Sequence, residues 1–143
     1  MTDHDIVDVL LVEDNAHDAE ITMRALSKLS HRVHWVRDGE EAIEYLRVSA
    51  LPRLVLLDLK MPKMSGIDVL RELRSTDRTV SIPVVMLTSS GQERDIAECY
   101  RYGANGFAVK PIDLQELEGV VQRIGLYWLL VNRPPEPGGL RRK

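Results

Sequence analysis

The sequence contains a single cysteine, Cys99, among its 143 residues. No internal disulfide bond can therefore form, which suits a reducing compartment. Residues 1–5 are polar and acidic, and they lack the basic and apolar regions of a secretory signal. The densest apolar stretch, residues 126–131, is far too short to span a bilayer. The formal net charge of −3 predicts no bulk attraction to nucleic acid or to an anionic membrane. These absences predict a cytoplasmic protein.

The composition that is present is ordinary for a globular protein, with 44% hydrophobic and 29% charged residues. A chain of this length fits one domain with a single sizeable core. We expect that domain over residues 1–131. Residues 132–143 form a basic, Pro/Gly-rich tail. Because proline removes a backbone donor and clashes with the preceding helical turn, we expect this tail to be an extended arm or a disordered end.

Five apolar runs that are typical of strands alternate with five segments in which apolar residues recur at helical spacing. The expected strands are residues 6–12, 32–36, 54–57, 84–87 and 107–109. Asn15 and Asp113 are expected to cap the first and last helices, and the last helical pattern reaches Trp128. This alternation favours right-handed βαβ crossovers. It predicts an α/β fold, with helices on both faces of a parallel sheet.

Polar residues stand where the expected strands end. After the first, third, fourth and fifth strands come Glu13-Asp14, Asp58, Thr88 and Lys110-Pro111. The carboxyl ends of parallel strands meet at one edge of a sheet, where open α/β sheets bind ligands. We therefore expect three acids, a hydroxyl and an ammonium in one crevice. A cis bond before Pro111 could aim Lys110 into that crevice, and the sequence leaves the isomer open.

This set of side chains fits a magnesium ion and a phosphoryl group. Singly, each residue also has an ordinary structural interpretation, such as an acid in a first helical turn or a turn residue. Together, acids held this close are typical of a cation site, and magnesium prefers a few carboxylates with water and phosphate oxygens. Asp58 is the expected nucleophile, since carboxylates form aspartyl phosphates. Thr88 and Lys110 are expected to stabilise the charge on the phosphoryl oxygens.

The ordered motifs resemble the receiver domain of two-component response regulators over about residues 6–130. The similarity rests on Glu13-Asp14 after Leu11-Val12, residues 57–62 with Gly66, Leu87-Thr88-Ser89, and residues 107–111. The resemblance implies a flavodoxin-like, doubly wound fold. Its five-stranded parallel sheet would have the order 2-1-3-4-5 and be accompanied by five helices.

The resemblance also implies functional residues. Asp58 would accept phosphate from a sensor histidine kinase or a histidine phosphotransfer protein. The implied magnesium ligands are Glu13, Asp14, Asp58 and the backbone carbonyl of Lys60. The implied contacts to the phosphoryl oxygens are made by Thr88, Lys110 and the backbone amide of Ser89. No enzymatic activity is expected beyond self-phosphorylation and self-dephosphorylation.

A conformational switch is implied at Thr88 and Phe107. Phosphorylation adds roughly −1.5 to −2 charge and three strong acceptors. This charge would draw Thr88 inward and free space for Phe107 to rotate. The alternative interpretation of Phe107 is a simple core ring.

Softer motifs, which include Asn15, Asp18 and residues 127–130, are similar to the stand-alone regulators paired with bacterial phytochromes. The kinase partner implied by this similarity is of the phytochrome type. Only the tail follows the expected receiver, so we expect neither an appended DNA-binding unit nor a transcription factor. Residues 126–131 are apolar almost all round, which is more than a helix with one buried face requires. We therefore expect a homodimer through the last helix and the tail, with a lattice contact as the alternative explanation.

The sequence disfavours three other functions relative to the receiver. A phosphatase of the aspartyl-phosphate type also places a nucleophilic Asp after a buried strand, but such enzymes have a second Asp at the position of Lys60. Nucleotide binding is disfavoured because neither a P-loop nor a Gly-x-Gly-x-x-Gly run occurs. A receiver fold kept only as a scaffold would predict gaps in the acid, Thr and Lys set, and the sequence has none.

Overall fold

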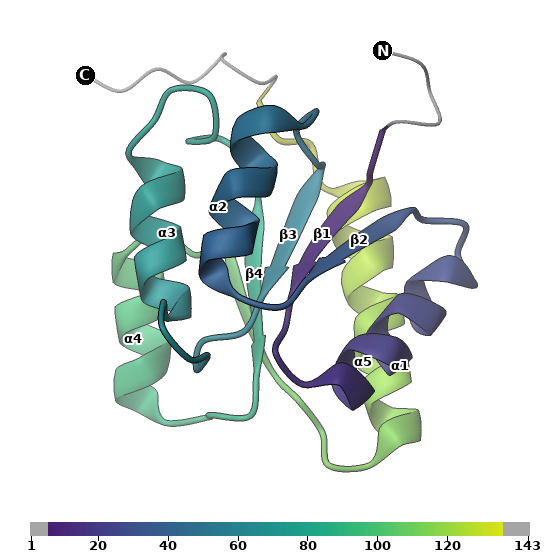
Figure 1. The fold of residues 1–143 in the computed structure, drawn as a ribbon. Helices are drawn as coiled ribbons and strands as arrows, with labels where there is room; N and C mark the ends of the chain where they lie inside the picture. Colours follow the sequence, from purple (N-terminus) through teal and green to yellow (C-terminus); the bar gives the residue numbers. More distant parts are fainter. Residues whose placement is uncertain (1–5, 136–143) are drawn as a thin grey trace.

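A computed structural model describes residues 6–135 as strands and helices in strict alternation (Figure 1). The strands are β1 (Val9–Val12), β2 (Val33–Val36), β3 (Leu54–Leu57), β4 (Val84–Thr88) and β5 (Gly106–Val109). The helices are α1 (Ala16–Ser27), α2 (Gly39–Val48), α3 (Gly66–Arg74), α4 (Glu93–Arg101), α5 (Leu114–Gly125) and a terminal turn, η2 (Leu126–Val131). Among these residues, no helix is both long and apolar enough to cross a membrane.

The five strands form one parallel sheet in the order β2-β1-β3-β4-β5. This order and the five accompanying helices confirm the flavodoxin-like prediction. β2 lies at one edge of the sheet, and its residues are less buried than those of the inner strands. All five strands point the same way, so their carboxyl ends gather at the lower edge in Figure 1.

Short polar side chains start most of the helices at this edge. Asn15 accepts a hydrogen bond from the backbone N–H of Asp18, and Asp113 accepts from two N–H groups in the first turn of α5. Asp38 caps α2 in the same way, and Ser65 forms a reciprocal capping box with Asp68 at α3. These caps fix the residue at which each of the four helices begins. They therefore also fix where the preceding strand-to-helix loops, which carry site residues, end.

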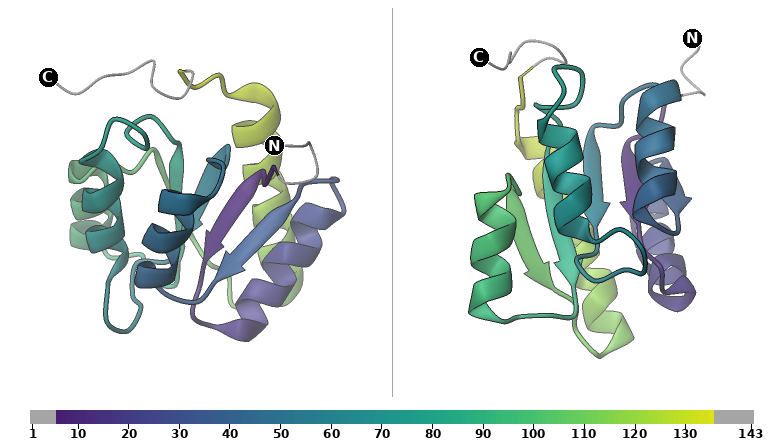
Figure 2. Two further views of the ribbon diagram at one scale, coloured as in Figure 1. Left: turned by 45° about the horizontal axis from the view of Figure 1, so that its top comes forward. Right: turned by 60° about the vertical axis from the view of Figure 1, so that its left-hand side comes forward.

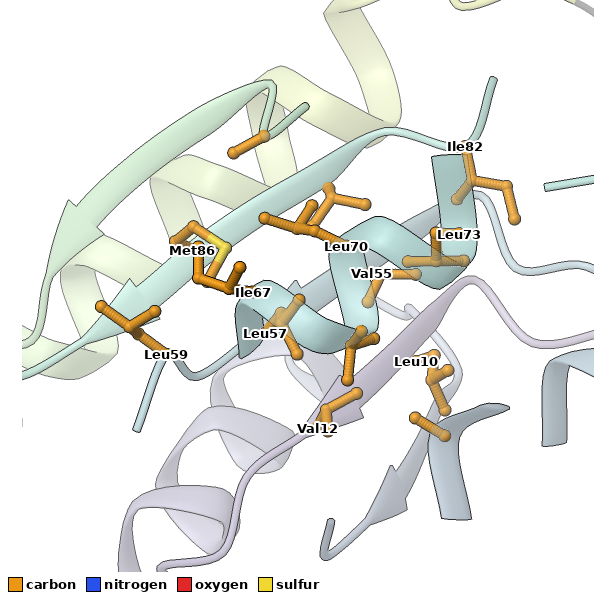
Figure 3. Packing of buried hydrophobic residues seen from close by; sticks show 14 of the residues in the cluster. Leu10, Val12, Val55, Leu57, Leu59, Ile67, Leu70, Leu73, Ile82 and Met86 are labelled. Carbon is orange, nitrogen blue, oxygen red and sulfur yellow. The ribbon is translucent and has the colours of Figure 1, made fainter. Parts of the chain in front are cut away.

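The three inner strands, β1, β3 and β4, are buried on both faces, so their successive residues belong to different cores. Leu10 and Val12 pack with α2, α3 and α4, whereas Val9 and Leu11 pack with α1 and α5. Figure 3 shows the first of these cores between the sheet and α3. Figure 2 shows the two helical layers on opposite sides of the sheet.

Two boundaries differ from the sequence-based prediction by more than one residue. The first strand begins at Val9 rather than at residue 6, because the N–H groups of Asp8 and Val9 both donate to the carbonyl of Arg32 and interrupt the regular ladder. The last α-helix ends at Gly125, and residues 126–131 continue it as a wider π-helical turn (Figure 2). The N–H of Asn132 closes that turn with a 2.7 Å bond to the carbonyl of Tyr127.

Regular structure ends before the prolines of the tail. Residues 132–135 have no regular secondary structure. The rest of the predicted tail, residues 136–143, lies outside the described residues.

Candidate functional site

The carboxyl edge of the sheet brings the predicted site residues together. Glu13 follows β1 and Asp58 follows its neighbour β3, and each extends the sheet by one more backbone hydrogen bond. The N–H of Glu13 donates to the carbonyl of Val36, and the N–H of Asp58 donates to the carbonyl of Val12, each at 3.1 Å. Thr88 is the last residue of β4, the other neighbour of β3, and it is 1% exposed. Glu13 and Asp58 are also buried, with 3% and 7% of their surface exposed. Burying carboxylates without a partner is costly, so the arrangement calls for positive charge nearby.

Three carboxylates form a cluster that is suited to a cation. Glu13, Asp14 and Asp58 each offer an oxygen, and these oxygens lie within 4.8 Å of one another. Asp14 is exposed while the other two are buried, so the cluster opens to solvent on one side. Hard divalent cations prefer such a set of carboxylate oxygens, with water completing the coordination. The donor set therefore fits the predicted metal.

Lys110 supplies the positive charge that the buried acids require. Its Nζ lies 2.6 Å from Glu13 Oε1, 3.0 Å from Asp18 Oδ2 and 3.3 Å from Asp58 Oδ2. No cis peptide bond occurs within residues 6–135, so Lys110 reaches these carboxylates with a trans bond before Pro111. The backbone N–H of Lys110 is held 2.8 Å from the carbonyl of Thr88.

Burial and charge shift the proton equilibria of this ion pair. Burial raises the pKa of Glu13 from 4.5 to about 7, the nearby Asp58 charge adds to this shift, and the hydrogen bond from Lys110 opposes it. Burial alone would lower the pKa of Lys110, but its hydrogen bond to Glu13 and the Asp58 charge outweigh burial and raise that pKa above its ordinary value. Lys110 is therefore a permanent cation in this site, while Glu13 exchanges a proton near neutral pH.

The structure adds two residues to this site that the motif analysis left without a role. The sequence identified Asp18 only as part of a motif similar to the stand-alone regulators, yet its carboxylate contacts the Lys110 ammonium. Its place in the first turn of the helix that Asn15 caps was the available signal, since that turn begins at the edge where the site residues gather. Trp35, on β2, donates a 2.8 Å hydrogen bond from its Nε1 to the backbone carbonyl of Glu13. Nothing in the sequence links Trp35 to Glu13, because the contact depends on strand pairing.

The remaining predicted residues surround this centre. Ser89 and Lys60 are exposed in the loops after β4 and β3. The Nζ of Lys60 lies 3.8 Å from Asp95 Oδ2, and the same oxygen accepts a hydrogen bond from the hydroxyl of Ser90. Asp95 thus connects the loop that carries Lys60 with the start of α4. Phe107 is half-buried and packs against the core on the α2, α3 and α4 side.

Comparison with known proteins gives consistent matches. A model of the response regulator receiver domain matches residues 9–122. The archaeal protein named "Probable methanogenesis regulatory protein FilR2", from Methanothrix harundinacea, is 41% identical over 90% of this chain and 88% of its own length. Response regulator Rcp1 of Synechocystis sp. is 36% identical over 85% of this chain and 88% of its own length.

Two solved structures share the fold over nearly the whole chain. The phosphorylated cyanobacterial phytochrome response regulator RcpA superposes with a TM-score of 0.86 and 37% identity, over 92% of this chain and 99% of its own. The Mn²⁺-bound form of Rcp1 gives a TM-score of 0.84 and 33% identity, over 91% of this chain and 99% of its own.

Proposed function

Because this chain belongs to the response regulator receiver domain family, we propose that it accepts a phosphoryl group on Asp58 and relays a signal through its altered surface. The observation that carries the proposal is the placement of Asp58 within a carboxylate cluster suited to a cation and 3.3 Å from a buried ammonium. The phosphorylated state of RcpA and the Mn²⁺-bound state of Rcp1 support it by similarity.

In the proposed reaction, a carboxylate oxygen of Asp58 attacks the phosphorus of the donor. The new O–P bond forms as the donor's bond to phosphorus breaks, and the leaving group departs with that electron pair. Lys110, the Thr88 hydroxyl and the Ser89 amide bind the phosphoryl oxygens, where negative charge gathers. The proposed magnesium ligands are Glu13, Asp14, Asp58 and the backbone carbonyl of Lys60. Magnesium, when bound, neutralises part of the charge on the phosphoryl oxygens.

The output of the proposed switch is a shift between two surface arrangements. Thr88 moves toward the phosphoryl group, and the half-buried Phe107 rotates into the space that Thr88 leaves. The backbone bond between Lys110 and Thr88 keeps the ends of β4 and β5 together during this change. Such a switch needs a partner that binds one arrangement better than the other.

The acetyl phosphate reaction tests the proposal directly. Incubation of the protein with acetyl phosphate and Mg²⁺ is expected to add the mass of one phosphoryl group, which hydroxylamine removes. Asp58→Asn should take up none. Asp38→Asn makes the same change at a helix cap, where Asn serves as well as Asp, and it should be labelled like the wild type. Labelling of Asp58→Asn at the wild-type level would refute the assignment of Asp58.

The proposed phosphodonor is a sensor histidine kinase of the phytochrome type, acting directly or through a histidine phosphotransfer protein in the cytoplasm. Similarity to RcpA, a cyanobacterial phytochrome response regulator, supports this partner. Transfer of labelled phosphate from a cyanobacterial phytochrome kinase, at a rate well above that from a kinase of another sensor class, is the expected result. Equal rates from both kinases would reject the phytochrome pairing.

We also propose a homodimer through η2 and the tail that follows it. On η2, Tyr127, Leu130 and Val131 are 49%, 64% and 62% exposed, whereas Leu129 is buried. The exposed side chains form an apolar surface at the end of the fold, of the kind that marks an interface. Leu130→Asp is expected to halve the mass measured by light scattering, while Ile112→Asp, at a fully exposed position, should leave it unchanged. A monomeric wild type would exclude the dimer.

Phosphatase activity toward small phosphoesters is the alternative function. It is disfavoured because the position two residues after Asp58 holds Lys60, whose ammonium is directed to Asp95. We propose that the protein is a signalling receiver, whose only chemistry is its own phosphorylation and dephosphorylation.

A further inference from the structure

Lys110 has one carboxylate neighbour for each of its three N–H groups. Its Nζ contacts Glu13, Asp18 and Asp58 at 2.6, 3.0 and 3.3 Å. An ammonium has three donors and no acceptor, so these three carboxylates can occupy all of them. The Lys110 side chain is 6% exposed, which leaves it little room for other partners.

The three carboxylates differ in the roles they have besides binding Lys110. Glu13 and Asp58 belong to the cation-binding cluster, whereas Asp18 lies outside it. Asp58 is in addition the proposed phosphoryl acceptor. Asp18 is therefore the neighbour whose contact with Lys110 does not compete with either task. It reaches Lys110 from the more open rim of the site, where its side chain is 23% exposed.

The position of Asp18 is itself fixed by the start of α1. Its backbone N–H donates a 3.0 Å bond to the side chain of Asn15, the N-cap of that helix. Asn15 in turn donates its backbone N–H to Glu13 Oε2 at 3.0 Å. Asn15 thus joins Glu13 and Asp18, the two acids nearest the Lys110 ammonium, through one hydrogen bond to each.

We propose that Asp18 is a positioning residue that anchors the Lys110 ammonium, so that its other two N–H groups are directed at the phosphoryl oxygens on Asp58. The inference rests on the proposed phosphorylation of Asp58. A lysine side chain is long and flexible, and its ammonium is a point charge without the fixed fork of arginine. A carboxylate that stays bound to the Lys110 ammonium, as Asp18 can, restricts this ammonium to the place where the phosphoryl group forms.

The merely structural alternative is that Asp18 stabilises α1 as an acid in its first turn. Phosphorylation kinetics with acetyl phosphate at saturating Mg²⁺ separate the two roles. Asp18→Ala, which loses the charge-assisted bond, should slow phosphorylation about tenfold. Asp18→Asn keeps an acceptor oxygen without the charge, so its rate should lie between those of Asp18→Ala and the wild type. Glu20→Ala removes an exposed acid from the same helix and should leave the rate unchanged.

A double-mutant cycle tests whether Asp18 acts through Lys110. In a Lys110→Met background, Asp18→Ala should change the remaining rate less than about twofold. An equal slowing in both backgrounds would overturn the inference, as would a wild-type rate for Asp18→Ala alone. If the wild type takes up no phosphoryl group, the proposed function fails, and the role of Asp18 fails with it.

A second readout does not depend on phosphorylation. In nitrogen-15 spectra of the Mg²⁺-loaded protein, the Lys110 ammonium protons should exchange slowly with water in the wild type and Glu20→Ala. Their exchange should become fast in Asp18→Ala. This measurement needs no replacement of Lys110, so it stands even where Lys110→Met does not fold. Slow exchange in Asp18→Ala would overturn the anchoring role while leaving the proposed phosphorylation of Asp58 intact.

Discussion

The carboxylate of Glu13 lies 2.6 Å from the ammonium of Lys110, and the two side chains are 3% and 6% exposed. Glu13 belongs to the carboxylate cluster proposed to hold magnesium, and Lys110 also contacts Asp58, the proposed phosphoryl acceptor. The pKa of Glu13 is nevertheless raised to about 7, because burial and the Asp58 charge outweigh the effect of Lys110. The site therefore holds more negative charge than one lysine can balance.

The stability of the metal-free protein should fall as the pH rises from about 5 to about 7.5. Between the ordinary pKa of 4.5 and the folded value of about 7, the folded state holds a proton on Glu13 that the unfolded state has lost. The loss amounts to at most about 3 kcal/mol from this group. Urea unfolding at several pH values without metal measures it. Glu13→Gln should flatten the slope, whereas Glu20→Gln, on the exposed side of α1, should preserve it.

Magnesium binding should release a proton from Glu13, since a carboxylate must be deprotonated to bind a cation. The apparent Mg²⁺ affinity should therefore rise as the pH increases toward the Glu13 pKa of about 7 and level off above it. Calorimetry in buffers of different ionisation enthalpy counts the proton. Binding at pH 6 that is independent of the buffer would show that Glu13 is already ionised or is not a ligand.

Trp35→Phe should weaken both the fold and the metal site. The change removes the 2.8 Å hydrogen bond from the indole to the backbone carbonyl of Glu13. It should cost about 1 kcal/mol of unfolding free energy and lower Mg²⁺ affinity, because the Glu13 backbone loses a support. Trp128→Phe changes the other tryptophan, which packs against Gly106 at the opposite end of the fold. Mg²⁺ affinity that drops equally in both variants would argue against a local role for Trp35.

Gly66→Ala should disturb the loop that follows Asp58. A Cβ at Gly66 would lie 2.5 Å from the backbone oxygen of Asp58 and 2.9 Å from the Cα of Leu59, and neither atom can move without shifting the loop. We expect a loss of about 2 kcal/mol in stability and weaker Mg²⁺ binding. Gly119→Ala, on α5, has ordinary space and should be neutral or stabilising. Urea unfolding and Mg²⁺ titration of both variants make the comparison, and matching losses would contradict this explanation.

The sequence predicted the elements better than their ends. The alternation of strands and helices and the caps at Asn15 and Asp113 were evident from local patterns, and the structure confirms them. The start of β1 could not be predicted in this way, because the carbonyl of Arg32 is shared between two consecutive amides only after the strands have paired. The widened turn at Leu126–Val131 was likewise hidden, since an apolar run does not distinguish α-helical from π-helical bonding.

By itself the sequence determined which chemical groups the protein carries and where along the chain they stand, including Glu13, Asp58 and Lys110 at strand ends. Those positions follow from local hydrogen bonding and hydrophobic periodicity, which act over a few residues. Only the tertiary structure decided that Asp18 shares the Lys110 ammonium and that Trp35 supports Glu13. Both contacts join segments that are distant in sequence, and they exist only because the parallel sheet brings the ends of β1, β2 and β5 to one edge.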